Sequence, residues 1–144
     1  MGFGGLEAPK DIPTEIKNKI VELENKSGSE LEYLQVAYDF VTSRWHAGRL
    51  ETIFYVPLAF RTNLSEILGQ PGYGHCNTQN YFLYVLLVKS KYFKPEDIKL
   101  KTVFFNFFIH QYLQVRISGK FMDADPAGAS IRGKQLGQRI SFFG

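Results

Sequence analysis

The chain is organised around the stretch GYGHCNTQNYFLYVLLV, which covers residues 72–88. Glycines at its start interrupt regular structure, whereas the apolar run Tyr81–Val88 is too long to be a turn. The pattern therefore predicts a buried helix that begins at Cys76 and continues to about Ser90. At a helix N-terminus the unpaired backbone N–H groups and the helix dipole favour a thiolate over a thiol. Cys76, the single cysteine of the chain, is thus a candidate nucleophile.

Two amphipathic helices are expected ahead of this stretch. The first covers residues 11–28 and the second residues 29–45, as the spacing of their apolar positions indicates. Their apolar faces are predicted to contain Ile16, Ile20, Val21 and Leu23 in the first helix, and Leu31, Leu34, Ala37, Tyr38 and Val41 in the second. Residues 1–10 are glycine-rich and are expected to form a loose tail, whereas residues 52–60 have an extended pattern.

The periodicity becomes that of strands after residue 97. Strands are predicted at residues 98–105, 108–117 and 121–125, with a turn between the last two. One face of the middle strand holds His110, Tyr112, Gln114 and Arg116, and the other holds Ile109, Leu113, Val115 and Ile117. The predicted fold class is α+β, in which N-terminal helices and a central buried helix carrying Cys76 pack on a C-terminal antiparallel sheet of three or more strands. Residues 1–144 are expected to form one domain.

Composition and charge exclude several functional classes. The formal net charge is only +3 and the basic residues are scattered, so a nucleic-acid partner is not expected. A loose basic stretch at residues 89–101 is interpreted as solvated surface. No apolar run is long enough to span a bilayer, and no basic-then-apolar leader opens the chain, so neither a membrane partner nor secretion is expected. Together with the single cysteine, these features favour a cytoplasmic protein.

Downstream residues could complete a thiol site around Cys76. An amide carbonyl resists attack by a thiol unless a base removes the thiol proton and hydrogen-bond donors hold the oxyanion. Cys76, His110 and Asp125 are therefore the candidate nucleophile, base and orienter of the base. Asp123, two residues before Asp125, is an alternative orienter. The backbone N–H of Cys76 and the side chain of Gln70 are candidate donors to the oxyanion.

A metal site is the weaker interpretation of the same residues. His75, Cys76 and His110 could bind an ion together with an aspartate. However, this set lacks the closely spaced ligand pairs that are typical of structural zinc sites. No metal ion or other cofactor is therefore expected.

The order of these motifs resembles the transglutaminase-like superfamily of thiol enzymes. Residues 74–76 form a Gly-x-Cys motif that opens an apolar helix, and His110 begins an alternating strand. Phe121 then precedes Asp125-Pro126 by four residues, where that superfamily has a tryptophan. The resemblance covers roughly residues 30–127. It implies a papain-like core with a Cys-His-Asp catalytic triad.

The chain departs from that pattern at several positions. Tyr112 and Gln114 stand where the superfamily commonly has a tryptophan and a glutamate in the histidine strand. The oxyanion donor also stays open, because Gln70 has the spacing found in papain-like proteases. Trp45 or Tyr55 would be closer to the donor that transglutaminases use.

The sequence thus predicts a thiol enzyme that acts on amide or peptide carbonyls through a Cys76 thioester. The resemblance implies a hydrolase (a cysteine protease or amidase) or an acyl transferase of the transglutaminase type, with a protein or peptide substrate. Hydrolysis is favoured because no extra domain to hold a polymer is visible. The alternative is a non-catalytic protein- or peptide-binding module on the same fold, which the departures at Tyr112 and Gln114 and an aromatic content of 15% favour.

Overall fold

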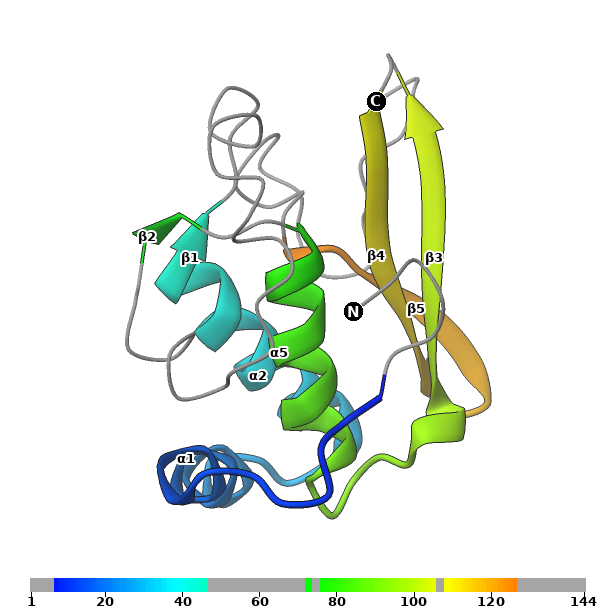
Figure 1. The fold of residues 1–144 in the computed structure, drawn as a ribbon. Helices are drawn as coiled ribbons and strands as arrows, with labels where there is room; N and C mark the ends of the chain where they lie inside the picture. The colour runs from blue at the N-terminus through cyan, green and yellow to red at the C-terminus, as the bar shows by residue number, and fades with distance from the viewer. Residues whose placement is uncertain (1–6, 47–71, 74–75, 106–107, 127–144) are drawn as a thin grey trace.

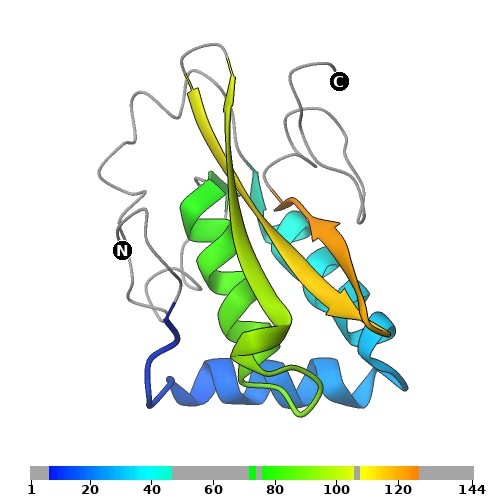
Figure 2. The same cartoon turned by 90° about the vertical axis from the view of Figure 1, so that its right-hand side faces the viewer.

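The computed structural model of the chain describes residues 7–46, 72–73, 76–105 and 108–126. The elements are helices α1 (Thr14–Asn25), α2 (Glu30–Arg44) and α5 (Cys76–Val88), the short 3₁₀-helix η2 (Pro95–Asp97), and strands β1 (Trp45–His46), β2 (Gly72–Tyr73), β3 (Ile98–Phe105), β4 (Phe108–Ile117) and β5 (Lys120–Ala124). Helices α2 and α5 lie on one side of the β3–β4–β5 sheet, and α1 crosses their ends (Figure 1 and Figure 2). The described residues therefore have the α+β architecture that the sequence predicted.

Helix α5 forms the middle of the hydrophobic core. Every residue from Tyr81 to Leu87 is at most 5% exposed. Such complete coverage explains why this part of the sequence has no polar stripe. Its fully buried partners are Tyr33, Leu34, Ala37 and Val41 from α2, Leu113 and Val115 from β4, and Ala124 from β5. The prediction of a central buried helix starting at Cys76 is confirmed.

Two apolar residues that the sequence placed on buried faces are exposed instead. Val21 is 52% exposed, because it lies about 100° around α1 from Ile20 and so turns away from the core. Leu31 is 44% exposed although its spacing from Leu34 is correct. It lies in the first turn of α2, where the described elements do not cover that face. The remaining predicted core positions of both helices are buried.

The sheet has the strand order β3-β4-β5 and is antiparallel throughout. Ser118 and Gly119 connect β4 to β5 with φ angles of 51° and 82°. Two successive positive φ angles produce the tight hairpin loop whose twist matches that of the strands. The N–H of Ser118 also donates to a carboxylate oxygen of Glu30 at 3.0 Å, which ties this turn to the start of α2. β5 ends at Ala124, one residue earlier than predicted, so Asp125 lies just beyond the strand.

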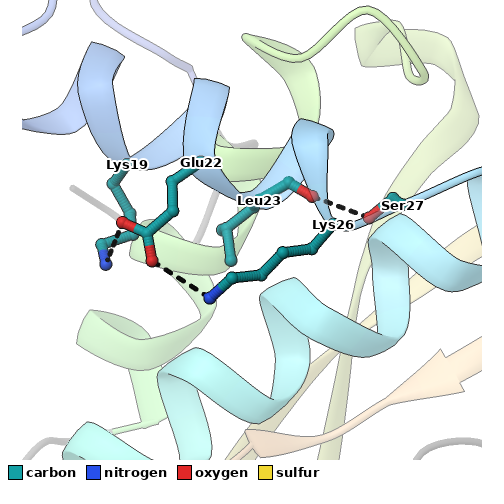
Figure 3. A network of polar contacts seen from close by, with 5 residues as sticks. All are labelled: Lys19, Glu22, Leu23, Lys26 and Ser27. Carbon is teal, nitrogen blue, oxygen red and sulfur yellow. Dashed lines mark hydrogen bonds and ion pairs between the residues drawn. The ribbon is translucent and has the colours of Figure 1, made fainter.

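Polar side chains form contacts from the middle of α1 to just after its end. The hydroxyl of Ser27 donates to the carbonyl oxygen of Leu23 at 2.8 Å, and Glu22 pairs with Lys19 and Lys26 at 2.9 and 3.1 Å (Figure 3). The hydrogen bond from Lys19 is the main cause of a lowered pKa of Glu22. Such exposed ion pairs stabilise a fold only weakly. No helix in the described ranges is long and apolar enough to cross a membrane.

Candidate functional site

Buried polar side chains gather near the predicted catalytic positions. Apart from tyrosines, the described residues bury five such side chains, each at most 2% exposed, namely Thr78, Gln79, Asn80, Gln111 and Asp125. Three of them lie in the first turns of α5, two to four residues after Cys76, and one follows His110 in β4. We call these five residues the polar cluster. Because burial of polar groups is costly unless they are hydrogen-bonded, these five side chains require a structural or functional explanation.

Strands β1 and β2 form a short parallel pair, and β2 comes shortly before α5 in the chain. Gly72 and Tyr73 in β2 pair with Trp45 and His46 in β1, which follow α2 directly. This pairing brings the backbone of Trp45 to the segment that leads into Cys76. The N-terminal end of α5, strand β1 and the end of β5 lie at the same end of the molecule in both views (Figure 1 and Figure 2).

One buried hydrogen bond joins α5 to the strand that carries His110. The side-chain nitrogen of Asn80 donates to the carbonyl oxygen of Gln111 at 2.7 Å. Asn80 is four residues after Cys76, so the two residues share a helix face. Gln111 is the next residue after His110 and in turn donates to the hydroxyl of Thr102 on β3 at 3.3 Å. The contact therefore anchors the helix face that starts at Cys76 against the strand position beside His110.

Asp125 is tied to α2 through its backbone. The hydroxyl of Tyr38 donates to the carbonyl oxygen of Asp125 at 3.0 Å, and both residues are buried. Burial is the main cause of a raised pKa of Tyr38, and the negative charges of Asp125 and Asp39 add to it. Tyr38 therefore stays protonated and able to donate at neutral pH. The hydrogen bond holds the end of β5 in place against the helical layer.

The alternative orienter, Asp123, has different surroundings. Its carboxylate accepts a hydrogen bond from the side-chain nitrogen of Gln114 at 2.9 Å, and it is only partly buried. Gln114 and Asp123 are opposite one another in the β4–β5 register. Asp125, in contrast, is fully buried. Burial thus favours Asp125 over Asp123 as the residue that would orient a catalytic base.

The structure describes some of the predicted site residues completely and others only in part. It describes Asp123 and Asp125 completely, and the backbone of Cys76, His110 and Trp45. The side chains of the last three, and the whole of Gln70, Tyr55 and His75, lie outside the described residues. The contact between Cys76 and His110 therefore stays a prediction. In the described ranges, no group of three or more His, Cys, Asp or Glu side chains is arranged to hold a metal ion.

Sequence reasoning did not predict a role at the candidate site for Asn80, Gln111 or Tyr38. Residues 78–80, Thr-Gln-Asn, are three successive polar residues in a helix whose next seven residues are buried and apolar or aromatic. That polar start of an otherwise buried helix was a usable signal for a site. The spacing of Tyr38 in α2 predicts only that its ring is buried. Its hydroxyl contacts a residue far along the chain, and no local sequence pattern predicts such a contact.

Comparisons of the chain with protein-family models, with curated proteins and with solved structures gave no match.

Proposed function

We propose that this chain is a thiol enzyme of the transglutaminase-like type, which attacks a peptide or amide carbonyl with Cys76. The observation that supports it most is the polar cluster, because four of its members lie within four residues of Cys76 or His110 in the chain and the fifth is Asp125 itself. Two buried hydrogen bonds connect the elements near these positions. The bond from Asn80 to Gln111 joins α5 to β4, and the bond from Tyr38 to Asp125 joins α2 to the end of β5. A catalytic group acts efficiently only if the surrounding helices and strands hold it in a fixed position.

The proposed reaction proceeds through a covalent thioester. His110 takes the thiol proton of Cys76, and the sulfur forms a bond to the carbonyl carbon. The backbone N–H of Cys76, at the start of α5, would stabilise the negative oxygen of the tetrahedral intermediate. His110 then returns the proton to the leaving amine as the C–N bond breaks. Asp125 would hold the imidazole in the required tautomer and balance its charge.

The second half of the reaction releases the acyl group. Water that attacks the thioester yields a carboxylate, whereas an amine yields a new amide. The proposed activity is thus that of a peptidase or amidase in the first case and of an acyl transferase in the second. A protein or peptide is the proposed substrate in both.

A non-catalytic binding module is the second candidate. One observation favours it: Gln114, which stands where the superfamily has a glutamate, hydrogen-bonds to Asp123 and so has a structural role. Such a module has no need for an acidic thiol. The reactivity of Cys76 therefore discriminates between the two candidates.

The test is the pH profile of Cys76 alkylation by iodoacetamide between pH 4 and pH 9. A thiol activated by a helix N-terminus and a histidine should react well below the ordinary pKa of about 8.5. His110→Ala should shift the profile upward. An ordinary thiol profile that His110→Ala leaves unchanged would refute the enzyme proposal and support the binding module.

A further inference from the structure

The sheet face that lies away from the helices carries exposed positive charge. Lys99 and Lys101 in β3 are exposed, and they alternate with Ile98 and Leu100, which pack against the core. Because strand residues alternate between faces, both lysines are on the outer side of the sheet. The register places four described charged side chains on this face, namely Lys99, Lys101, Arg116 and Asp123, so cations predominate three to one.

These two lysines, like several others in the described ranges, have no acidic partner. Lys19 and Lys26 share Glu22 (Figure 3), and Arg116 pairs with Asp97. No described carboxylate forms an ion pair with Lys99 or Lys101, whose uncompensated charge can attract an anion. Their Cα atoms are roughly 6.5–7 Å apart, since each strand residue advances about 3.3 Å.

An apolar surface adjoins the two lysines. Phe121 of β5 is 37% exposed, and the ammonium group of Lys99 lies 4.2 Å from the centre of its ring. Phe121 also lines a shallow depression of about 610 Å³, together with Gln114, Ile117, Lys120, Met122 and Asp123. The only described carboxylate in this lining, that of Asp123, accepts a hydrogen bond from Gln114. The surface therefore combines cations with a partly apolar hollow.

We propose that this outer sheet face binds an extended acidic segment of the polypeptide substrate. In an extended peptide, side chains two residues apart lie on one side at the spacing of Lys99 and Lys101, so acidic residues at positions i and i+2 can meet both lysines. An apolar side chain of the same segment would enter the depression beside Phe121.

The location of this face connects it to the proposed reaction. Lys101 is opposite Tyr112 in the β3–β4 register, and Val103 is opposite His110, only two residues further along. Tyr112, which alternation places on the same face as Lys101, is only 2% exposed, so a bound segment would follow the edge strand β3, and not β4, toward the strand position opposite His110. This inference rests on the proposed function, because it assigns the bound segment to the substrate.

The test is fluorescence anisotropy with a labelled peptide that has Glu residues at alternate positions and one leucine. The control peptide has Gln in place of Glu. We expect the intact protein to prefer the acidic peptide, and Lys99→Glu combined with Lys101→Glu to weaken binding at least about ten-fold. Lys10→Glu combined with Lys17→Glu makes the same change of net charge on exposed residues near α1, and should change binding less than about three-fold. Thermal melts exclude unfolding, and Lys99→Gln with Lys101→Gln should show an intermediate loss.

Three outcomes would overturn the inference. One is equal affinity for the Glu and Gln peptides, and another is equal loss in both double variants. The third is equally tight binding of a single-stranded oligonucleotide of the same charge, which would mean that the face attracts polyanions in general. Cys76 alkylation, measured in parallel, separates this result from the fate of the enzyme proposal. Acidic-peptide binding alongside an ordinary thiol profile would overturn the assignment of the segment to a substrate, whereas an acidic thiol without peptide binding would overturn the docking face alone.

Discussion

Two buried tyrosine hydroxyls of α2 provide a matched pair of perturbations. Tyr33 donates to the carbonyl oxygen of Leu86 at 2.6 Å, near the C-terminal end of α5. Tyr38 donates to the carbonyl oxygen of Asp125 at 3.0 Å, at the end with the polar cluster. Replacement of either tyrosine by phenylalanine removes one hydroxyl and leaves the buried ring. The two changes are therefore chemically alike and differ in their distance from the predicted catalytic residues.

Each substitution should cost about 1–3 kcal/mol of unfolding free energy, because a buried carbonyl oxygen loses its donor. Urea unfolding would measure this cost, and we expect similar values for Tyr33→Phe and Tyr38→Phe. Their effects on the site should differ. Only Tyr38→Phe releases the backbone of Asp125, so it alone should lower amide turnover and raise the apparent pKa of Cys76 alkylation.

The raised pKa of each tyrosine ensures that both hydroxyls stay protonated across an assay from pH 4 to pH 9. Titration of the hydroxyls themselves therefore cannot cause a difference between the profiles. Equal changes in turnover for the two variants would show that general destabilisation is responsible. A normal thiol profile and normal turnover in a folded Tyr38→Phe protein would refute the claim that this contact positions Asp125 for catalysis.

Further predictions concern the other polar contacts. Asn80→Ala should lower the unfolding free energy by about 1–3 kcal/mol in urea titrations, and Asn80→Asp by more, since a buried carboxylate cannot donate. Asp125→Asn should reduce amide turnover far more than Asp123→Asn while both melt near the wild-type temperature; the reverse order would transfer the orienting role to Asp123. The pKa of Asp97 is lowered, chiefly by the Lys94 N–H, so its stabilising effect should be complete above about pH 4 and disappear as the pH falls through its folded value. Asp97→Asn should accordingly cost up to about 1 kcal/mol at pH 7 and almost nothing at pH 2, by urea unfolding.

Local sequence patterns predicted the helices and strands well, because glycines, turn residues and apolar periodicity are properties of neighbouring residues. Glycines and an apolar run fixed the start of α5, and Ser118 with Gly119 marked the hairpin. Exposure of Val21 and Leu31 was mispredicted because burial at the edge of a helix depends on which other elements cover it. Periodicity alone does not contain that information.

The hydrogen bonds around the candidate site could not be predicted from local patterns, because they join residues that are far apart in the chain. The Asn80–Gln111 hydrogen bond joins residues 31 positions apart, and the Tyr38–Asp125 hydrogen bond joins residues 87 positions apart. Strand alternation likewise treats Asp123 and Asp125 as equivalent. The structure separates them because β5 ends at Ala124 and Asp125 becomes buried beyond it.

The parallel pairing of β1 with β2 has a consequence for how this chain could diversify. It joins Trp45 to Gly72 and His46 to Tyr73, so the described residues on either side of positions 47–71 stand on adjoining strands about 5 Å apart. A segment with neighbouring ends can change in length or composition at little entropic cost to the rest of the fold. A new recognition segment could accordingly be inserted between β1 and β2 while the helices and the sheet keep their packing.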